Sequence, residues 1–289
     1  MDDYEPVRLS RREKLEEANE RLQAEKNKEP DKNAKSISEL IETVKNDIYA
    51  QREQGEKACG IKTGIEFIDS DITVFCPAEL ILVCGESSEG KTALMQRMVA
   101  NMTIRDNRSV LVLNLDITNE AFTRRLIAME ARIEKSKVIE EPEKMDEEEW
   151  EKFSETTKIL SDTRLYLDDA PGSTVDQICQ KCREYKEDND LEIVFIDYLQ
   201  CIQVESHKKT RKKDMRDFCF RLKKLAQELD IPIVAFMNLS SEGGVTKTEI
   251  VDNADIIMNF KETNHPEDDY FSIDVRRCSR MEVRDDRIH

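Results

Sequence analysis

The sequence predicts an α/β fold in which helices cover both faces of a mostly parallel, doubly wound sheet, preceded by an N-terminal helical arm. From Gly60 onward, short apolar runs rich in β-branched residues alternate with segments of helical periodicity. This alternation is typical of a parallel sheet that is buried on both faces. Before Gly60 the chain is rich in charged residues and holds one amphipathic segment. We therefore expect a charged helical arm over residues 1–57 and an α/β domain over residues 58–289.

Strands are expected where continuous apolar runs occur, at 80–85, 110–116, 165–170, 192–199, 231–238, 255–260 and 271–277. Periodicity predicts helices between them, at about 91–104, 119–134, 147–160, 174–187 and 212–229. In the arm, residues 36–53 place one apolar stripe along a helix, formed by Ile37, Leu40, Ile41, Val44 and Ile48. Such a helix has no core of its own. It would pack either on the body of its own chain or on a neighbouring subunit.

Composition limits the classes of partner. Lys and Arg number 45 against 62 Asp and Glu, which gives a net charge of −17. A chain this acidic is not a general binder of polyanions, so any contact with nucleic acid must come from a local basic patch. No apolar run reaches the length of a membrane span, and the N-terminus lacks the apolar stretch of a secretory signal peptide. We expect a cytoplasmic protein without a membrane partner.

The eight cysteines mostly lie within apolar runs and are expected to be buried apolar residues rather than disulfides. Cys179 and Cys182 have the spacing of half a zinc site, but no second pair follows at a suitable distance. Their helical spacing with neighbouring apolar residues favours a core position. The acidic run 140–155 is interpreted as a solvated helix face, with Trp150 and Phe153 turned inward.

The segment Leu80–Met98, LILVCGESSEGKTALMQRM, fits the spacing G-x-x-x-x-G-K-[ST] between a strand and a helix. Glycines let backbone N–H groups surround an anion, and the following helix adds its positive N-terminal end. Lys91 would reach the β- and γ-phosphates, and the Thr92 hydroxyl would hold Mg²⁺. A chance glycine turn is the alternative. The strand before and the helix after favour a nucleotide site made by Gly85, Glu86, Ser87, Ser88, Glu89, Gly90, Lys91, Thr92 and Ala93.

Polar residues end three other strands, and the carboxyl ends of parallel strands are where ligands bind in such sheets. Asp197 closes the run IVFID and can accept a hydrogen bond from a Mg²⁺-bound water beside Thr92. An aspartate that merely caps a turn is the alternative. Asp116 ends the run VLVLNLD, where a carboxylate could orient and deprotonate an attacking water. Asn238 could sense the γ-phosphate, because an amide both donates and accepts.

One concentrated basic loop lies between the strand that ends near Asp197 and the next helix. Its cations are Lys208, Lys209, Arg211, Lys212 and Lys213. Contact with a phosphate backbone would explain the cluster, and such binding would be salt-sensitive and independent of sequence. The alternative is a solvated loop that pairs with nearby acids.

With these residues in view, the chain resembles the ATPase domain of DnaB-type replicative helicases over about residues 60–260. The matching stretches, in order, are GIKTGIEFID, GESSEGKTAL, VLNLDITNEAFTRRLIAMEARI, DEEEWEKFSE, LYLDDAPGST, IVFIDYLQ, LKKLAQELDIPIVAFMNL and DNADIIMNF. The resemblance implies a RecA-like P-loop NTPase that forms a hexameric ring, binds ATP and Mg²⁺ between subunits, and moves along single-stranded DNA. It implies a catalytic position for Asp116 and a linker helix over residues 36–53 that docks on the neighbouring subunit.

The sequence departs from the family pattern at several points. The family usually has glutamate where Asp116 stands, and glutamine followed by Leu-Asn-Arg where Asn238 stands. The segment 239–253 is shorter than the family's, which carries a DNA-binding loop there. Arg277 and Arg280, with Arg276, are the candidates for the basic residue and arginine finger that reach a neighbour's site, although their spacing does not fit cleanly. The family's N-terminal domain has no counterpart in the sequence.

Two functions follow as expectations. The first is an ATP-hydrolysing helicase motor, with Lys91, Asp116 and Asn238 as its catalytic residues, working with other replication proteins. The alternative is a degenerate relative that binds ATP, turns it over slowly or not at all, and regulates or joins a replication complex. A RecA- or KaiC-like ATPase of another pathway is less compatible with the motif IDYLQ, Ile196–Gln200.

Overall fold

The computed structural model describes residues 36–54, 60–72, 74–85, 90–203, 211–238, 253–262 and 271–277. The chain divides into two compact units, Met1–Ala58 and Cys59–His289. The first unit contributes helix α2 (Ile37–Gln54). The Ser36 hydroxyl caps it by accepting from the Glu39 N–H at 3.3 Å, and the Glu39 carboxylate accepts from the Ser36 N–H at 2.9 Å. The predicted apolar stripe is exposed, and no described residue of its own unit covers it.

The second unit is built on a seven-stranded sheet with the order β3-β2-β4-β5-β1-β6-β7. All neighbouring pairs are parallel except β6 and β7. The strands are β1 (Leu80–Gly85), β2 (Val110–Asn114), β3 (Leu165–Asp169), β4 (Ile193–Asp197), β5 (Ile233–Asn238), β6 (Ile256–Glu262) and β7 (Phe271–Arg277). This arrangement confirms the predicted α/β class with a mostly parallel sheet. Strand β5 lies between β1 and β4, which is important for the site.

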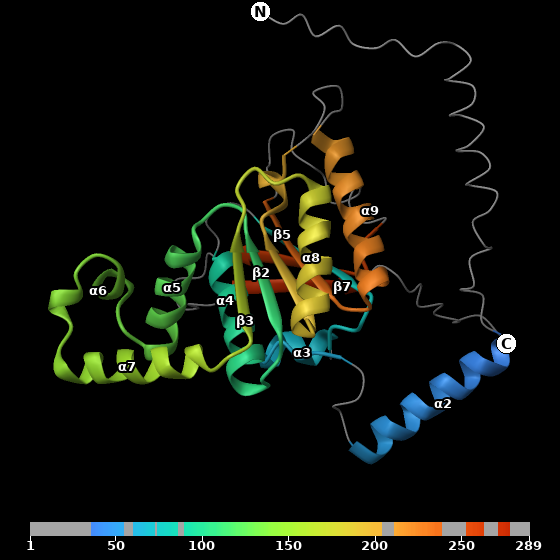
Figure 1. Cartoon of the computed structure of the whole chain (residues 1–289), viewed down its shortest axis with the longest axis horizontal. Helices are drawn as coiled ribbons and strands as arrows, with labels where there is room; N and C mark the ends of the chain where they lie inside the picture. Colours follow the sequence, from blue (N-terminus) through green and yellow to red (C-terminus); the bar gives the residue numbers. More distant parts are fainter. Residues whose placement is uncertain are drawn as a thin grey trace, which may run out of the picture. The chain divides into compact units, whose positions relative to one another are not determined.

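Helices cover both faces of the sheet (Figure 1). Alternate residues of a strand point to opposite faces, and β1 shows the consequence. Its residues Leu80 and Leu82 join a core formed with α8 (Val175–Asn189) and α9 (Arg211–Leu229). Its residues Ile81 and Val83 join a second core with α3 (Glu66–Ile72), α4 (Lys91–Ala100) and α5 (Asn119–Ala131). Because β1 is buried on both sides, its carboxyl end is held firmly in place.

Two helices end earlier than their periodicity predicts. Helix α4 continues beyond Ala100 only as a π-helical turn, Asn101–Arg105, in which the buried Asn101 amide donates to the carbonyls of Thr63 and Gly64 at 3.1 and 3.0 Å. Helix α5 stops at Ala131 because Arg132 adopts a left-handed conformation with φ 55°. The apolar pattern did not predict where α5 ends, because Ile133, which lies beyond the helix, is also buried.

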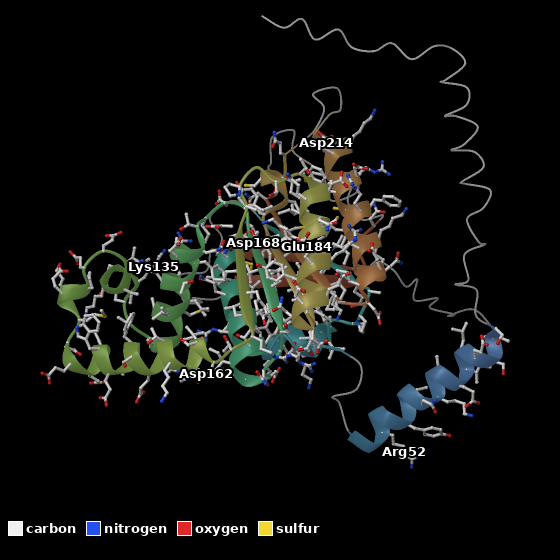
Figure 2. All side chains as sticks on the ribbon, in the orientation of Figure 1. Arg52, Lys135, Asp162, Asp168, Glu184 and Asp214 are labelled. Carbon is white, nitrogen blue, oxygen red and sulfur yellow. The ribbon has the colours of Figure 1, made fainter. Side chains whose placement is uncertain are left out.

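A helical extension follows α5 and consists of α6 (Lys135–Ile139), the 3₁₀ turn η3 (Pro142–Lys144) and α7 (Glu147–Ser161). Lys135 at its start and Asp162 just after α7 mark its limits (Figure 2). The extension has its own small core, made by Ile127, Ala128, Ala131, Ile133, Val138 and Met145 with Phe153 and Leu160 packed against it. The prediction that Trp150 turns inward is wrong: its side chain is 45% exposed, at the edge of this small core.

The cysteine prediction is confirmed in part: of the described cysteines, Cys84, Cys179, Cys182 and Cys219 are buried, whereas Cys76 and Cys201 are only half-buried. Cys179 and Cys182 are buried on the inner face of α8, and burial raises the pKa of both thiols. Among the described residues, no group of three or more His, Cys, Asp or Glu side chains is arranged to hold a metal ion. No helix in the described ranges is both long and apolar enough to cross a bilayer.

Candidate nucleotide site

The polar residues that end the parallel strands lie at one edge of the sheet. Gly85 of β1 pairs with Asn238 of β5, and Asp197 of β4 pairs with Asn114 of β2. The β2 strand ends at Asn114, so Asp116 lies two residues beyond it rather than within it. The Leu115 N–H still donates to the Asp197 carbonyl at 2.8 Å, which keeps this segment beside β4. The carboxyl edge of the sheet therefore gathers the predicted phosphate, metal and catalytic positions.

The P-loop ends at Gly90, which has φ 86° and ψ 12°. This left-handed conformation favours glycine, and α4 begins at the next residue, Lys91. The Lys91 side chain is 7% exposed, and its Nζ donates to the Gly85 carbonyl at 3.3 Å. A buried ammonium group is costly unless it is hydrogen-bonded and paired with negative charge. The Gly85 carbonyl is one such hydrogen-bond partner, and it ties Lys91 at the start of α4 to the first glycine of the motif; Glu86–Glu89 lie outside the described residues.

Thr92 and Asp197 meet directly. The Thr92 hydroxyl donates to Asp197 Oδ2 at 2.8 Å, although 105 residues separate them in the chain. Asp197 is 6% exposed, and burial raises the pKa of its carboxyl, against the hydrogen bond from Thr92 and the positive charges of Lys91 and Arg125. A buried carboxylate beside a hydroxyl is a pair of hard oxygen donors, which suits Mg²⁺. The donor set therefore fits the expected metal.

Asp116 faces the site from a more open position. Its side chain is exposed and makes no hydrogen bond or ion pair with any described residue. Its negative charge nevertheless contributes to the raised pKa of the Asp197 carboxyl, so the two carboxylates are close enough to interact. A carboxylate that is exposed and near the metal position is free to contact a water molecule.

Arg125 on α5 is a residue that the sequence interpretation did not include. Its positive charge acts on Asp197, and its side chain lines a hollow of about 520 Å³ together with Gly90, Thr92, Ala93, Gln96, Ala128, Met129, Ile133 and Lys135. Its neighbour Arg124 points elsewhere and donates to the Val138 carbonyl at 3.3 Å. The signal in the sequence was a cation in the second turn of a helix that begins at the carboxyl edge of the sheet. Periodicity did not distinguish the two adjacent arginines.

The remaining predicted residues are only partly described. Lys208, Lys209 and Arg280 lie outside the described ranges. Arg211 and Lys212 form the first turn of α9, where only their backbone is described, and the Lys213 side chain is exposed. Arg277 ends β7, paired with Ile256 of β6. Their predicted roles stay predictions.

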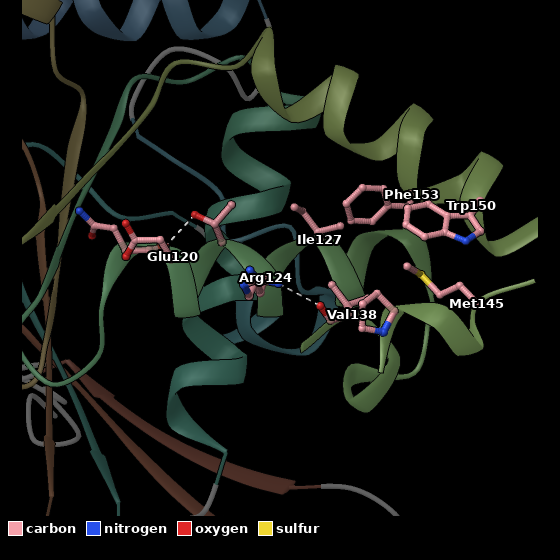
Figure 3. Close-up of a pocket in the computed structure, with 10 residues that line it drawn as sticks. Glu120, Arg124, Ile127, Val138, Met145, Trp150 and Phe153 are labelled. Atoms are coloured by element: carbon pink, nitrogen blue, oxygen red, sulfur yellow. Dashed lines mark hydrogen bonds between the residues drawn. The ribbon is translucent and has the colours of Figure 1, made fainter. Parts of the chain in front are cut away.

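A second hollow, of about 580 Å³, lies on the helical extension (Figure 3). It runs between α5, the α6–η3 segment and α7. Its apolar lining includes Ile127, Val138, Met145, Trp150 and Phe153, with Glu120 and Arg124 toward one end. We call it the extension groove. The exposed Trp150 is one of the residues that line this groove.

Comparisons with known proteins agree with this architecture. The sequence model of the DnaB-like helicase C terminal domain matches residues 60–258. The replicative DNA helicase DnaB of Geobacillus stearothermophilus is 31% identical over 210 residues, which cover 72% of this chain and 45% of that protein. The replicative DNA helicase DnaC of Bacillus subtilis is 31% identical over 202 residues, 70% of this chain and 44% of that protein. The chain thus matches less than half the length of these relatives.

Solved structures show the same fold. One solved ATPase domain superimposes with a TM-score of 0.72 at 24% identity, covering 80% of this chain and 84% of that one. A DnaB-like replicative helicase, solved to study its interactions with primase, gives a TM-score of 0.71 at 23% identity, covering 91% of this chain and 66% of that one. With the family match over most of the sheet and its carboxyl edge, the chain belongs to the DnaB-like helicase C terminal domain family.

Proposed function

We propose that this chain is an ATP-binding and ATP-hydrolysing helicase motor that moves along single-stranded DNA. The observation that carries the proposal is the contact between Thr92 and Asp197 at 2.8 Å, beside the buried Lys91. Three residues from two distant segments, the adjacent Lys91 and Thr92 and the strand-end Asp197, form a site for a phosphate chain and a divalent cation. The family to which the chain belongs supports the same function, although the chain matches only part of the helicases compared.

Nucleotide binding uses the buried residues of the site. The backbone N–H groups from Gly85 to Ala93 and the N-terminus of α4 would contact the phosphates, and Lys91 would neutralise the β- and γ-phosphates. Thr92 and Asp197 would hold Mg²⁺, which when bound neutralises charge that develops on the phosphate oxygens. Because Asp197 and Lys91 are already buried, little rearrangement of these side chains is needed on binding.

Hydrolysis uses the residues around the open side of the site. Asp116 would orient the attacking water and accept its proton, and Asn238 would contact the γ-phosphate from the end of β5. Arg277 and Arg280 are proposed to reach the site of a neighbouring copy, where guanidinium groups would stabilise charge in the transition state. The catalytic arrangement would then be complete only between two copies.

Binding of single-stranded DNA is assigned to the basic cluster at 208–213. Helix α9 begins at Arg211, so three consecutive cations, Arg211, Lys212 and Lys213, occupy its first turn. Positive charge is unfavourable at a helix N-terminus, by roughly 0.3–1 kcal/mol per charge. Helix stability therefore does not account for these residues, whereas contact with a phosphate backbone does.

Assembly would use α2. Its exposed stripe, Ile37 to Ile48, is apolar, and so is most of the lining of the extension groove. We therefore propose that the stripe packs into the extension groove of a neighbouring copy. The chain has one tryptophan, Trp150, and it lines that groove. Adding Mg²⁺ and a non-hydrolysable ATP analogue should give a ring, probed by size-exclusion chromatography, together with a blue shift of tryptophan emission. A strict monomer under these conditions would contradict the motor.

The ATPase rate with and without single-stranded DNA tests the function. We expect magnesium-dependent turnover that DNA stimulates and that Lys91→Ala abolishes. Neutralising Lys208, Lys209, Arg211, Lys212 and Lys213 should weaken DNA binding and flatten its salt dependence while turnover without DNA persists. Tight ATP binding without turnover would instead favour the degenerate, regulatory relative, which the exposed and shortened Asp116 makes a real alternative. Absence of nucleotide binding by calorimetry would contradict both.

A further inference from the structure

Gln200 makes an unusual contact with the end of β5. It lies in η4 (Leu199–Cys201), a single 3₁₀ turn that follows β4. Its side-chain Nε2 donates to the Asn238 carbonyl at 2.7 Å, and its Oε1 accepts from the Asn238 N–H at 3.2 Å. A side-chain amide has one donor face and one acceptor face, so this pair holds the backbone of Asn238 at two points.

The sheet explains why this contact is needed. The pairing of β4 with β5 runs from Val194↔Ile233 to Ile196↔Ala235 and goes no further, whereas β5 stays paired with β1 up to Gly85↔Asn238. The last residues of β5 therefore have a strand on one side only. Backbone N–H and C=O groups in such a position need a partner. The side-chain amide of Gln200 makes the hydrogen bonds to Asn238 that β4 no longer provides.

The 3₁₀ turn η4, which carries Gln200, is anchored in the core. Leu199 is 0% exposed and Ile202 is 4% exposed, and both belong to the core beneath α8 and α9. The turn is closed by the Cys201 N–H donating to the Tyr198 carbonyl at 3.0 Å and the Ile202 N–H donating to the Leu199 carbonyl at 3.2 Å. Gln200 therefore links the core directly after Asp197 to the residue beside Gly85.

We propose that Gln200 is a positioning residue that orients Asn238 toward the γ-phosphate and couples it to the strand that holds the metal. The inference rests on the proposed function, because it takes the carboxyl edge as the phosphate site and Asn238 as its sensor. Gln200 itself touches neither nucleotide nor metal in this scheme. Its loss would misplace the Asn238 amide, and the effect would fall on recognition of the third phosphate rather than on the first two.

The test compares affinities for a non-hydrolysable ATP analogue and for ADP, each with Mg²⁺, by titration calorimetry on the full chain. Gln200→Met keeps the length of the side chain and removes both hydrogen bonds. We expect it to weaken binding of the analogue about tenfold. Loss of a net hydrogen-bond contribution of about 1.4 kcal/mol corresponds to a tenfold change in affinity. ADP affinity should stay within about twofold, since the Lys91 and Thr92 contacts are intact. Gln203→Met, at an exposed position three residues away, is the matched control and should change neither affinity.

A double-mutant cycle separates positioning from general weakening of the fold. In the Asn238→Ala background there is no amide to orient, so Gln200→Met should cause little further loss of discrimination between the analogue and ADP. Additive losses, or unchanged discrimination in Gln200→Met alone, would overturn the inference. If Asn238→Ala itself leaves discrimination unchanged, the sensor role in the proposed function is what fails. Retained ADP binding shows that a variant is folded. If Gln200→Met does not fold, Gln200→Glu is the second variant, because it keeps the acceptor oxygen and loses the donor. Reduced discrimination between the analogue and ADP in Gln200→Glu would support the inference, and unchanged discrimination would overturn it.

Discussion

The two sides of the proposed nucleotide site differ in how they are held. On the metal side, Lys91 and Asp197 are buried, and Asp197 accepts a hydrogen bond from Thr92. On the hydrolysis side, Asp116 is exposed, and neither Asp116 nor Arg125 makes a hydrogen bond or ion pair with any described residue. The metal side is fixed by two cores that meet at β1, while the hydrolysis side lies beyond the end of β2 and on the surface of α5.

This difference separates nucleotide binding from nucleotide hydrolysis, two functions that are often treated as one. Residues fixed by the core bind a ligand without rearrangement, so we expect nucleotide and Mg²⁺ binding to be a property of the single chain. Residues that have no hydrogen-bond partner in the described part of the chain are positioned by the groups that complete the site, such as substrate, water or another copy of the chain. Turnover should therefore respond to changes at Asp116 and Arg125 that leave binding of ADP unaffected.

The largest effect is expected from Asp197→Asn, which breaks the metal side. The variant keeps the shape of the side chain and loses its charge. A divalent cation stabilises charge in the transition state by several kcal/mol, so we expect magnesium-dependent turnover to fall by at least about 100-fold. Steady-state ATPase rates over a range of Mg²⁺ concentrations measure this. A loss of less than about tenfold would show that another group holds the metal.

The same substitution, Asp197→Asn, should not lower the free energy of unfolding, although it lowers turnover. Burial raises the pKa of the Asp197 carboxyl, so the ionised form is disfavoured in the folded chain. A raised carboxyl pKa lowers stability at pH values above the folded pKa, and this cost disappears as the pH falls below the unfolded value. In metal-free buffer at neutral pH, Asp197→Asn should unfold at the same temperature as the parent chain or higher. A clear drop in its melting temperature would mean that the carboxylate is structurally required.

A smaller effect, and a gain, is expected from Asp116→Glu on the hydrolysis side. The family usually has glutamate here, and the side chain of aspartate is shorter by one methylene group. A misplacement of about 1 Å can cost about 100-fold in rate, so the added methylene should raise turnover by about tenfold or more. Single-turnover rates with bound ATP isolate the chemical step. ADP affinity should not change.

Asp116→Asn is the control for this substitution, because it removes the charge without moving the side chain. It should lower the single-turnover rate, since an amide does not accept the proton of the attacking water. If Asp116→Glu also lowers the rate, the site has adapted to aspartate, and the shorter side chain is not what limits the chemistry.

The residues of the proposed metal side are also those whose positions the sequence predicted in most detail. Gly85, Gly90, Lys91 and Thr92 follow a fixed spacing in which strand, turn and helix are local, so the arrangement of these four residues relative to one another follows from the sequence. Asp197 ends a continuous apolar run, and a parallel sheet brings all such ends to one edge. The α/β class followed from the same alternation of strands and helices. Local pattern and topology were sufficient for these residues.

The hydrolysis side and the extension depended on tertiary contacts that no local pattern encodes. Asp116 was expected at the end of a strand, but β2 stops at Asn114 and leaves it exposed. Trp150 was expected to turn inward, but it lines the extension groove and is 45% exposed. Gln200 and Asn238 are 38 residues apart, and their contact depends on where the pairing of β4 with β5 ends. These positions are determined by how elements end, which periodicity indicates poorly.

The smallest expected effect concerns two adjacent arginines that differ only in direction. Arg125 faces the hollow beside Thr92, whereas Arg124 donates to the Val138 carbonyl in the extension. Arg125→Gln should weaken a non-hydrolysable ATP analogue by about tenfold relative to ADP, because a charged hydrogen bond contributes roughly 1.5–3 kcal/mol. Arg124→Gln is the matched control: it should leave both affinities unchanged and lower the free energy of unfolding by about 1 kcal/mol. Calorimetry and denaturant unfolding on both variants measure these effects. If the two substitutions weaken the analogue equally, the hollow beside Thr92 has no specific part in binding the third phosphate, and the hydrolysis side depends on Asp116 and a neighbouring copy alone.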